Sequence, residues 1–154
     1  MGGTVLLLKN LLFTFLVPGT VAVYVPLWIV GDRAAAGGVL QILALAVLAL
    51  GFAIYAWCVW DFARFGRGTP APIDAPKRLV VRGLYRRSRN PMYVGVLSVI
   101  LGWSLWFGAP VLAGYAAGVF SLFQAFVVLY EEPHLEGEFG DSYREYCAAV
   151  RRWF

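Results

Sequence analysis

Long apolar runs separated by short polar breaks fill the first 130 residues of the chain. Four of these runs approach or exceed the ~20 residues that an α-helix needs to cross a bilayer. They cover about residues 5–30, 39–60, 92–107 and 111–130. The pattern therefore predicts an all-α integral membrane protein, with four transmembrane helices in a single domain over residues 1–154.

Two stretches of mixed character lie outside these runs. Residues 61–91 hold glycines, prolines and most of the basic side chains, which predicts a loop that lies partly on the membrane surface. Residues 131–154 place apolar side chains at helical spacing among charges. Gly140 predicts a break there, and Ser142 followed by Glu145 predicts a capped restart, so we expect a broken amphipathic helix.

The composition agrees with a membrane protein, because 60% of the residues are hydrophobic and 14% are charged. Soluble domains carry about 25% charged residues. Cys58 and Cys147 are too few to form a disulfide framework. With His134 as the single histidine, no metal site is expected.

Positive charge is concentrated in the predicted loop. Four crossings place both termini on one side of the membrane, and of the 13 basic residues only Arg33 falls on the other side. Basic residues favour the cytoplasmic side, so both termini are expected in the cytoplasm, with the loop near anionic headgroups of the cell membrane. No nucleic-acid partner is expected. Eight basic residues lie between positions 64 and 89: Arg64, Arg67, Lys77, Arg78, Arg82, Arg86, Arg87 and Arg89.

The candidate chemistry lies at two points on the predicted cytoplasmic side. A basic strip ends in the string 89–93 at the start of the third helix, and the pair Glu131-Glu132 ends the fourth. A hairpin of these helices brings Tyr93 and Glu131 to similar depth. Acids at a membrane boundary need partners, since an unpaired buried charge is costly. They either pair with loop arginines or bind an amino-acid-like ligand through its ammonium group, with an arginine for its carboxylate.

Several strings occur together in a characteristic order. They are Gly83-Leu84-Tyr85, Arg89-Asn90-Pro91-Met92-Tyr93-x-Gly95, Glu131-Glu132-Pro133, and Phe139-Gly140-x-x-Tyr143 ahead of Arg151-Arg152-Trp153. Through them the chain resembles, over roughly residues 50–154, the membrane methyltransferases typified by isoprenylcysteine carboxyl methyltransferase and phosphatidylethanolamine N-methyltransferase. The resemblance implies S-adenosyl-L-methionine as cofactor. It also implies a membrane-embedded lipid or hydrophobic small molecule, an amine or a carboxylate, as methyl acceptor.

The resemblance also implies roles for particular residues. For methyl transfer to an amine, the acceptor must lose a proton, and Glu132 is the candidate to accept it, while Arg86, Arg87 and Arg89 are candidates to bind the cofactor carboxylate or a lipid phosphate. The residues expected to contact the cofactor are Gly51, Leu79, Val80, Tyr85, Asn90, Pro91, Met92, Tyr93, Glu131 and Glu132.

Two positions depart from the prenylcysteine enzymes. Asn90 stands where they carry histidine, and Val127 stands where they place a substrate-binding arginine. The strings Asn-Pro-Met-Tyr and Tyr-Glu-Glu-Pro look more like those of the lipid amine enzymes. A role for His134 in proton transfer, the identity of the acceptor and the oligomeric state stay open.

Two other functions fit parts of the chain. Tyr146-Cys147 resembles an aromatic-cysteine pair of NADPH-dependent sterol or enone reductases, but the chain has no Rossmann glycine fingerprint. A non-enzymatic membrane module is the other alternative. It is favoured if the paired acids are bound by arginines with no cavity between them.

Overall fold

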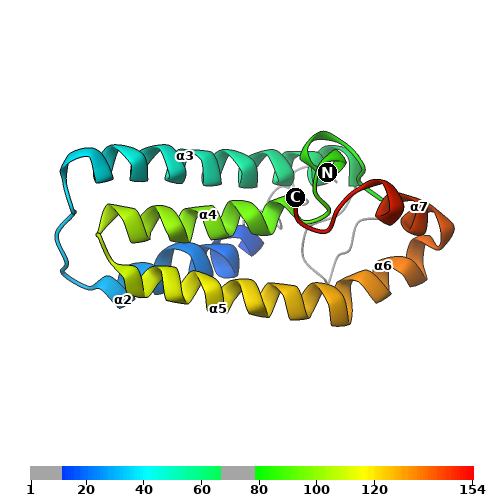
Figure 1. The fold of residues 1–154 in the computed structure, drawn as a ribbon. Coiled ribbons are helices and arrows are strands. Elements are labelled where there is room, and N and C mark those ends of the chain that lie inside the picture. The colour runs from blue at the N-terminus through cyan, green and yellow to red at the C-terminus, as the bar shows by residue number, and fades with distance from the viewer. Residues whose placement is uncertain (1–11, 67–78) are drawn as a thin grey trace.

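Four helical segments run antiparallel, one after the next, and form an elongated bundle (Figure 1). The computed structural model of the chain describes residues 12–66 and 79–154. Residues 5–11 of the first predicted helix and residues 67–78 of the predicted loop lie outside these described ranges. Within them every regular element is helical. The long segments are Leu12–Val30, which includes η1 (Thr20–Tyr24) and α2 (Val25–Val30), then α3 (Gly38–Asp61), α4 (Pro91–Trp106) and α5 (Pro110–Phe126).

Within residues 12–66 and 79–154, three helical segments are long and apolar enough to cross a membrane, so the protein is a multi-pass membrane protein. They are Leu12–Val30, Gly38–Phe65 and Pro110–Phe139. The all-helical prediction is confirmed, while the fourth crossing stays a prediction. The α4 helix has 16 residues, and at ~1.5 Å per residue it falls short of the ~30 Å hydrocarbon core.

The α4 helix is the centre of the bundle, because it packs against α3, α5 and the first helical segment. Its buried face includes Val96, Val99 and Ile100. The outer faces of the other helices expose large apolar side chains that suit a lipid environment. Examples are Trp28, Val39, Leu122 and Leu129.

The predicted end of the fourth helix near residue 130 is wrong. The helix continues from α5 through the π-helical turn η5 (Val127–Glu131) into α6 (Glu132–Phe139). Proline usually breaks a helix because it lacks a backbone donor. Here Pro133 lies two residues after the π turn, in the first turn of α6, and the wider spacing of the π turn accommodates such a defect. The two acids therefore lie inside one continuous helix.

The predicted break at Gly140 is confirmed, and the chain reverses there. Gly140 has φ +53°, a left-handed conformation that favours glycine. The α7 helix (Asp141–Ala149) follows at once, without a side-chain cap, so the expected capping box at Ser142 is wrong. The reversal brings α7 against the loop that leads to the start of α4, where Tyr146 and Cys147 contact Tyr85 and Arg89. A short 3₁₀ helix, η4 (Gly83–Arg86), leads into that start.

Candidate functional site

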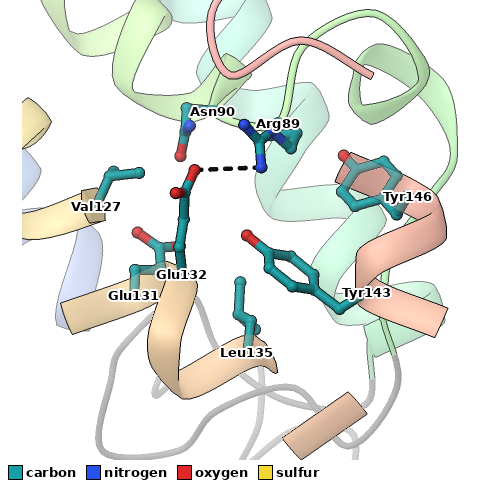
Figure 2. A pocket seen from close by; sticks show the side chains of 8 residues that line it. All are labelled: Arg89, Asn90, Val127, Glu131, Glu132, Leu135, Tyr143 and Tyr146. Carbon is teal, nitrogen blue, oxygen red and sulfur yellow. Dashed lines mark ion pairs between the residues drawn. The ribbon is translucent and has the colours of Figure 1, made fainter. Parts of the chain in front are cut away.

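A small cavity lies at the end of the bundle where α4 begins (Figure 2). Its volume is about 20 Å³, which is room for roughly one water molecule. The cavity is surrounded by the helix over η5 and α6, by the loop that precedes α4, and by α7. The lining residues are Arg89, Asn90, Val127, Glu131, Glu132, Leu135, Tyr143 and Tyr146.

The first turn of α4 contacts the acidic pair directly. Pro91 occupies the first turn of the helix, where its missing N–H is no loss. The Tyr93 hydroxyl donates a hydrogen bond of 2.9 Å to Glu131 Oε2. The Tyr93 ring lies on Phe123 of α5, with ring centroids 4.5 Å apart. The structure thus brings together the two residues that the hairpin argument placed at similar depth.

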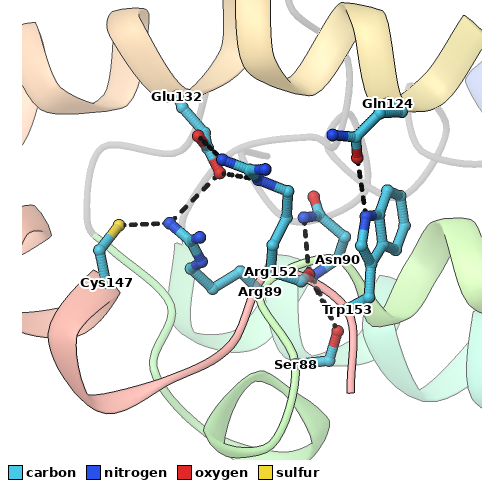
Figure 3. A network of polar contacts seen from close by, with 8 residues as sticks. All are labelled: Ser88, Arg89, Asn90, Gln124, Glu132, Cys147, Arg152 and Trp153. Carbon is cyan, nitrogen blue, oxygen red and sulfur yellow. Dashed lines mark hydrogen bonds and ion pairs between the residues drawn. The ribbon is translucent and has the colours of Figure 1, made fainter.

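Glu132 is held by two arginines (Figure 3). Arg152 donates to both carboxylate oxygens, through Nε at 2.8 Å and Nη2 at 2.9 Å. Arg89 Nη1 lies 3.2 Å from Oε1. This hydrogen bonding raises the pKa of the Arg152 guanidinium above its ordinary value. Two-point contacts between a guanidinium and a carboxylate are among the stronger polar contacts in proteins.

The loop before α4 is tied to the residues that follow α7. The buried Asn90 amide donates from Nδ2 to the Arg152 carbonyl at 2.9 Å, and the Arg89 backbone N–H donates to the Arg151 carbonyl at 2.9 Å. The Ser88 hydroxyl donates to the Arg152 carbonyl at 3.4 Å. The side-chain N–H of Asn90 therefore binds the backbone of the residues that follow α7.

The α7 helix contributes two buried tyrosines and a cysteine. The Tyr146 hydroxyl donates to the Tyr85 carbonyl at 2.7 Å, and Arg89 Nη1 donates to Cys147 Sγ. Burial raises the pKa of Tyr85, Tyr143 and Tyr146 above the ordinary value. These hydroxyls stay protonated at neutral pH, and those of Tyr143 and Tyr146 can act as hydrogen-bond donors at the cavity that they line.

The other residues predicted to contact the cofactor do not line the cavity. Val80, Tyr85 and Met92 pack in a cluster with Cys58 of α3. Leu79, next to Val80, is half-buried. Gly51 faces α4, where an added Cβ would lie 2.9 Å from the Gly95 carbonyl oxygen. Cofactor roles for these residues stay predictions.

The sequence did not assign a role in the site to the side chains of Arg152, Gln124 and Trp153. The Trp153 indole donates from Nε1 to Gln124 Oε1 at 2.8 Å, and its ring lies 5.1 Å from that of Phe120. A glutamine within an apolar helix is a usable signal, because its amide needs a partner there. His134 is exposed and stacks on Tyr130, with ring centroids 5.9 Å apart, outside the cavity lining.

Replacing Tyr93 by phenylalanine removes the hydroxyl that donates a hydrogen bond to Glu131. We expect the free energy of unfolding to fall by about 1.5 kcal/mol, since the half-buried acceptor loses its donor. Unfolding in detergent measures this effect. Tyr130→Phe is the control, because Tyr130 is 47% exposed and should change stability little. Equal losses in the two variants would contradict the importance of the hydrogen bond.

Comparison with known proteins identifies the family of the chain. The family described as phospholipid methyltransferase matches residues 39–142. A 63-residue stretch is 43% identical to an uncharacterized protein of Haemophilus influenzae (strain ATCC 51907 / DSM 11121 / KW20 / Rd), a match covering 40% of this chain and 98% of that protein. No solved structure matches the chain significantly. Because the family match extends over more than half of its length, the chain belongs to the phospholipid methyltransferase family.

Proposed function

We propose that the protein is an S-adenosyl-L-methionine-dependent methyltransferase of the cell membrane, with both termini in the cytoplasm. Its acceptor is a membrane-embedded lipid or another hydrophobic molecule that carries an amine or a carboxylate. The contact between Tyr93 and Glu131 carries this proposal. It joins the Asn-Pro-Met-Tyr string to the acidic pair at one cavity, as a shared binding site requires.

The residues around the cavity suit the polar groups of such a cofactor. Glu131 and Glu132 suit an ammonium or sulfonium group, and Arg89 suits a carboxylate. The space does not suit it, because about 20 Å³ is far less than a nucleoside-sized ligand needs. The arrangement described here is therefore closed, and binding requires part of the lining to move.

The cofactor supplies an activated methyl group, so the protein's main tasks are alignment and exclusion of water. An amine acceptor must also lose a proton, and Glu132 is the proposed acceptor. Both of its oxygens accept hydrogen bonds from Arg152. Release of one of these contacts would leave an oxygen of Glu132 more accessible to the proton of a substrate.

Binding of S-adenosylhomocysteine to the purified protein tests the proposal. A ligand that binds only the folded state stabilises it, by about 1.4 kcal/mol at ten times its Kd. We therefore expect the melting temperature in detergent to rise with ligand concentration. NADPH is the control ligand and should give no shift. A shift with NADPH alone would support the reductase alternative, which the comparisons do not favour.

A non-enzymatic membrane module is the second candidate, and one observation favours it. Glu132 contacts two arginines, and the cavity beside it is small. This is the arrangement expected if the acids serve only to hold the fold together. No thermal shift with either ligand at millimolar concentration would favour this candidate over the methyltransferase.

A further inference from the structure

Residues 151–153 form a strap that crosses from the loop before α4 to α5 and α6 (Figure 3). On one side, the Arg151 and Arg152 carbonyls accept hydrogen bonds from the Arg89 N–H and the Asn90 amide. On the other side, the Arg152 guanidinium binds Glu132 and the Trp153 indole binds Gln124. The strap therefore connects the two halves of the site.

The contact between Arg152 and Glu132 differs from the others in the strap. It joins a side chain that is 34% exposed to an acid that is 19% exposed and lines the cavity. Water and charged ligands can reach an exchangeable ion pair of this kind more easily than a fully buried one. The Glu132 carboxylate is thus occupied by a group of the protein at the position where a ligand cation would bind.

We infer that the strap gates the site and that the bond from Arg152 to Glu132 is its latch. This inference rests on the proposed function, because the ligand class it names is the zwitterionic amino-acid end of the cofactor. The ligand's ammonium replaces the guanidinium on Glu132, and the released Arg152 faces the ligand's carboxylate. Each charge then exchanges one partner for another, so no charge is left unpaired when the strap moves.

The backbone next to the strap permits this movement. Val150 ends α7 in an extended conformation, with φ −127° and ψ 130°. It precedes the strap directly and can act as its hinge without a change in α7. Opening breaks the hydrogen bond between the Arg89 N–H and the Arg151 carbonyl, which is 2.9 Å long. The Arg89 amide proton therefore reports strap opening without any ligand.

Hydrogen exchange at the Arg89 amide tests the latch, with overlapping peptides over residues 84–90 in detergent. In Arg152→Gln we expect exchange about tenfold faster than in the unaltered protein, the effect of losing one charge-assisted contact. Arg152→Lys keeps the charge but not the two-point geometry, so its rate should be intermediate. Arg151→Gln is the control, because that side chain is exposed. Unchanged exchange in Arg152→Gln would overturn the latch and leave the proposed function intact.

The association rate of S-adenosylhomocysteine, followed by stopped-flow tryptophan fluorescence, tests the gate. It should rise by a similar factor in Arg152→Gln, because the closed state no longer limits binding. Faster exchange with an unchanged association rate would show that the strap does not gate the site. Faster exchange with no binding to any variant would contradict the proposed function, and the gate with it. If Arg152→Gln does not fold, Gln124→Leu removes the indole's acceptor instead and should give the same two changes.

Discussion

Replacing Glu132 by glutamine should lower the free energy of unfolding by about 3 kcal/mol, since it removes the counter-charge of two partly buried arginines. The side chain of Arg89 is 13% exposed, so its guanidinium cannot regain full hydration. Glutamine has nearly the same shape, so the loss reports charge and not packing. Thermal or chemical unfolding in detergent measures the change.

A matched control lies on the same helix. Glu138 is exposed, and Glu138→Gln removes the same charge from α6. Exposed charges contribute little to stability, so this variant should remain within about 0.5 kcal/mol of the unaltered protein. The double variant Glu132→Gln with Arg152→Gln should recover part of the loss, because one uncompensated cation is then absent. Equal losses in the two single variants would mean that Glu132 is no more than a surface charge.

The helices that the sequence located well have clear local boundaries. The predicted range 92–107 lies within one residue of α4 (Pro91–Trp106), because proline marks a helix start and Gly108, with φ +54°, marks the turn after it. The predicted range 39–60 lies equally close to α3 (Gly38–Asp61). In both cases a glycine or proline limits the apolar run, so local chemistry is enough to place the ends.

The end of the fourth helix is set by contacts with residues that are distant in the sequence. Glu131, Glu132 and Pro133 together indicate a helix leaving the membrane and stopping. The chain instead continues as a helix to Phe139, because the π turn accommodates the proline and Tyr93 and Arg152 bind the acids. Those partners come from distant parts of the chain. Composition around position 131 alone does not predict them.

In the site, too, one contact could be predicted from the sequence and another could not. Tyr93 and Glu131 could be brought together from the sequence, since a short hairpin fixes the relative depth of its two helices. The partner of Glu132 could not be chosen from the sequence, because there were many candidates. They are the eight basic residues of the loop, Arg89 among them, and the basic residues at positions 144, 151 and 152. The reversal at Gly140 decides the matter by directing α7 back toward α4. A glycine predicts that a helix stops, but not the direction of the chain after it.

Gly51 was predicted to contact the cofactor, whereas its surroundings indicate close helix packing. An added Cβ would lie 2.9 Å from the Gly95 carbonyl oxygen, from the Val99 N atom and from Val99 Cγ2. Two of these atoms are backbone, so a rotamer change cannot relieve the clash. Membrane helices commonly pack closely through such small residues.

Gly51→Ala should therefore lower the free energy of unfolding by about 2 kcal/mol, because α3 and α4 must move apart to admit one methyl group. Gly118→Ala is the matched control, since nothing lies within 4 Å of its added Cβ. Alanine favours helix over glycine, so that variant should be neutral or up to about 1 kcal/mol more stable. Unfolding and S-adenosylhomocysteine affinity are measured on both variants, with affinity taken well below the melting temperature. Unchanged stability with weaker ligand binding in Gly51→Ala would favour cofactor contact over packing. A packing residue would lower the free energy of unfolding, whereas a residue that only touches the ligand would lower the affinity and leave the stability unchanged.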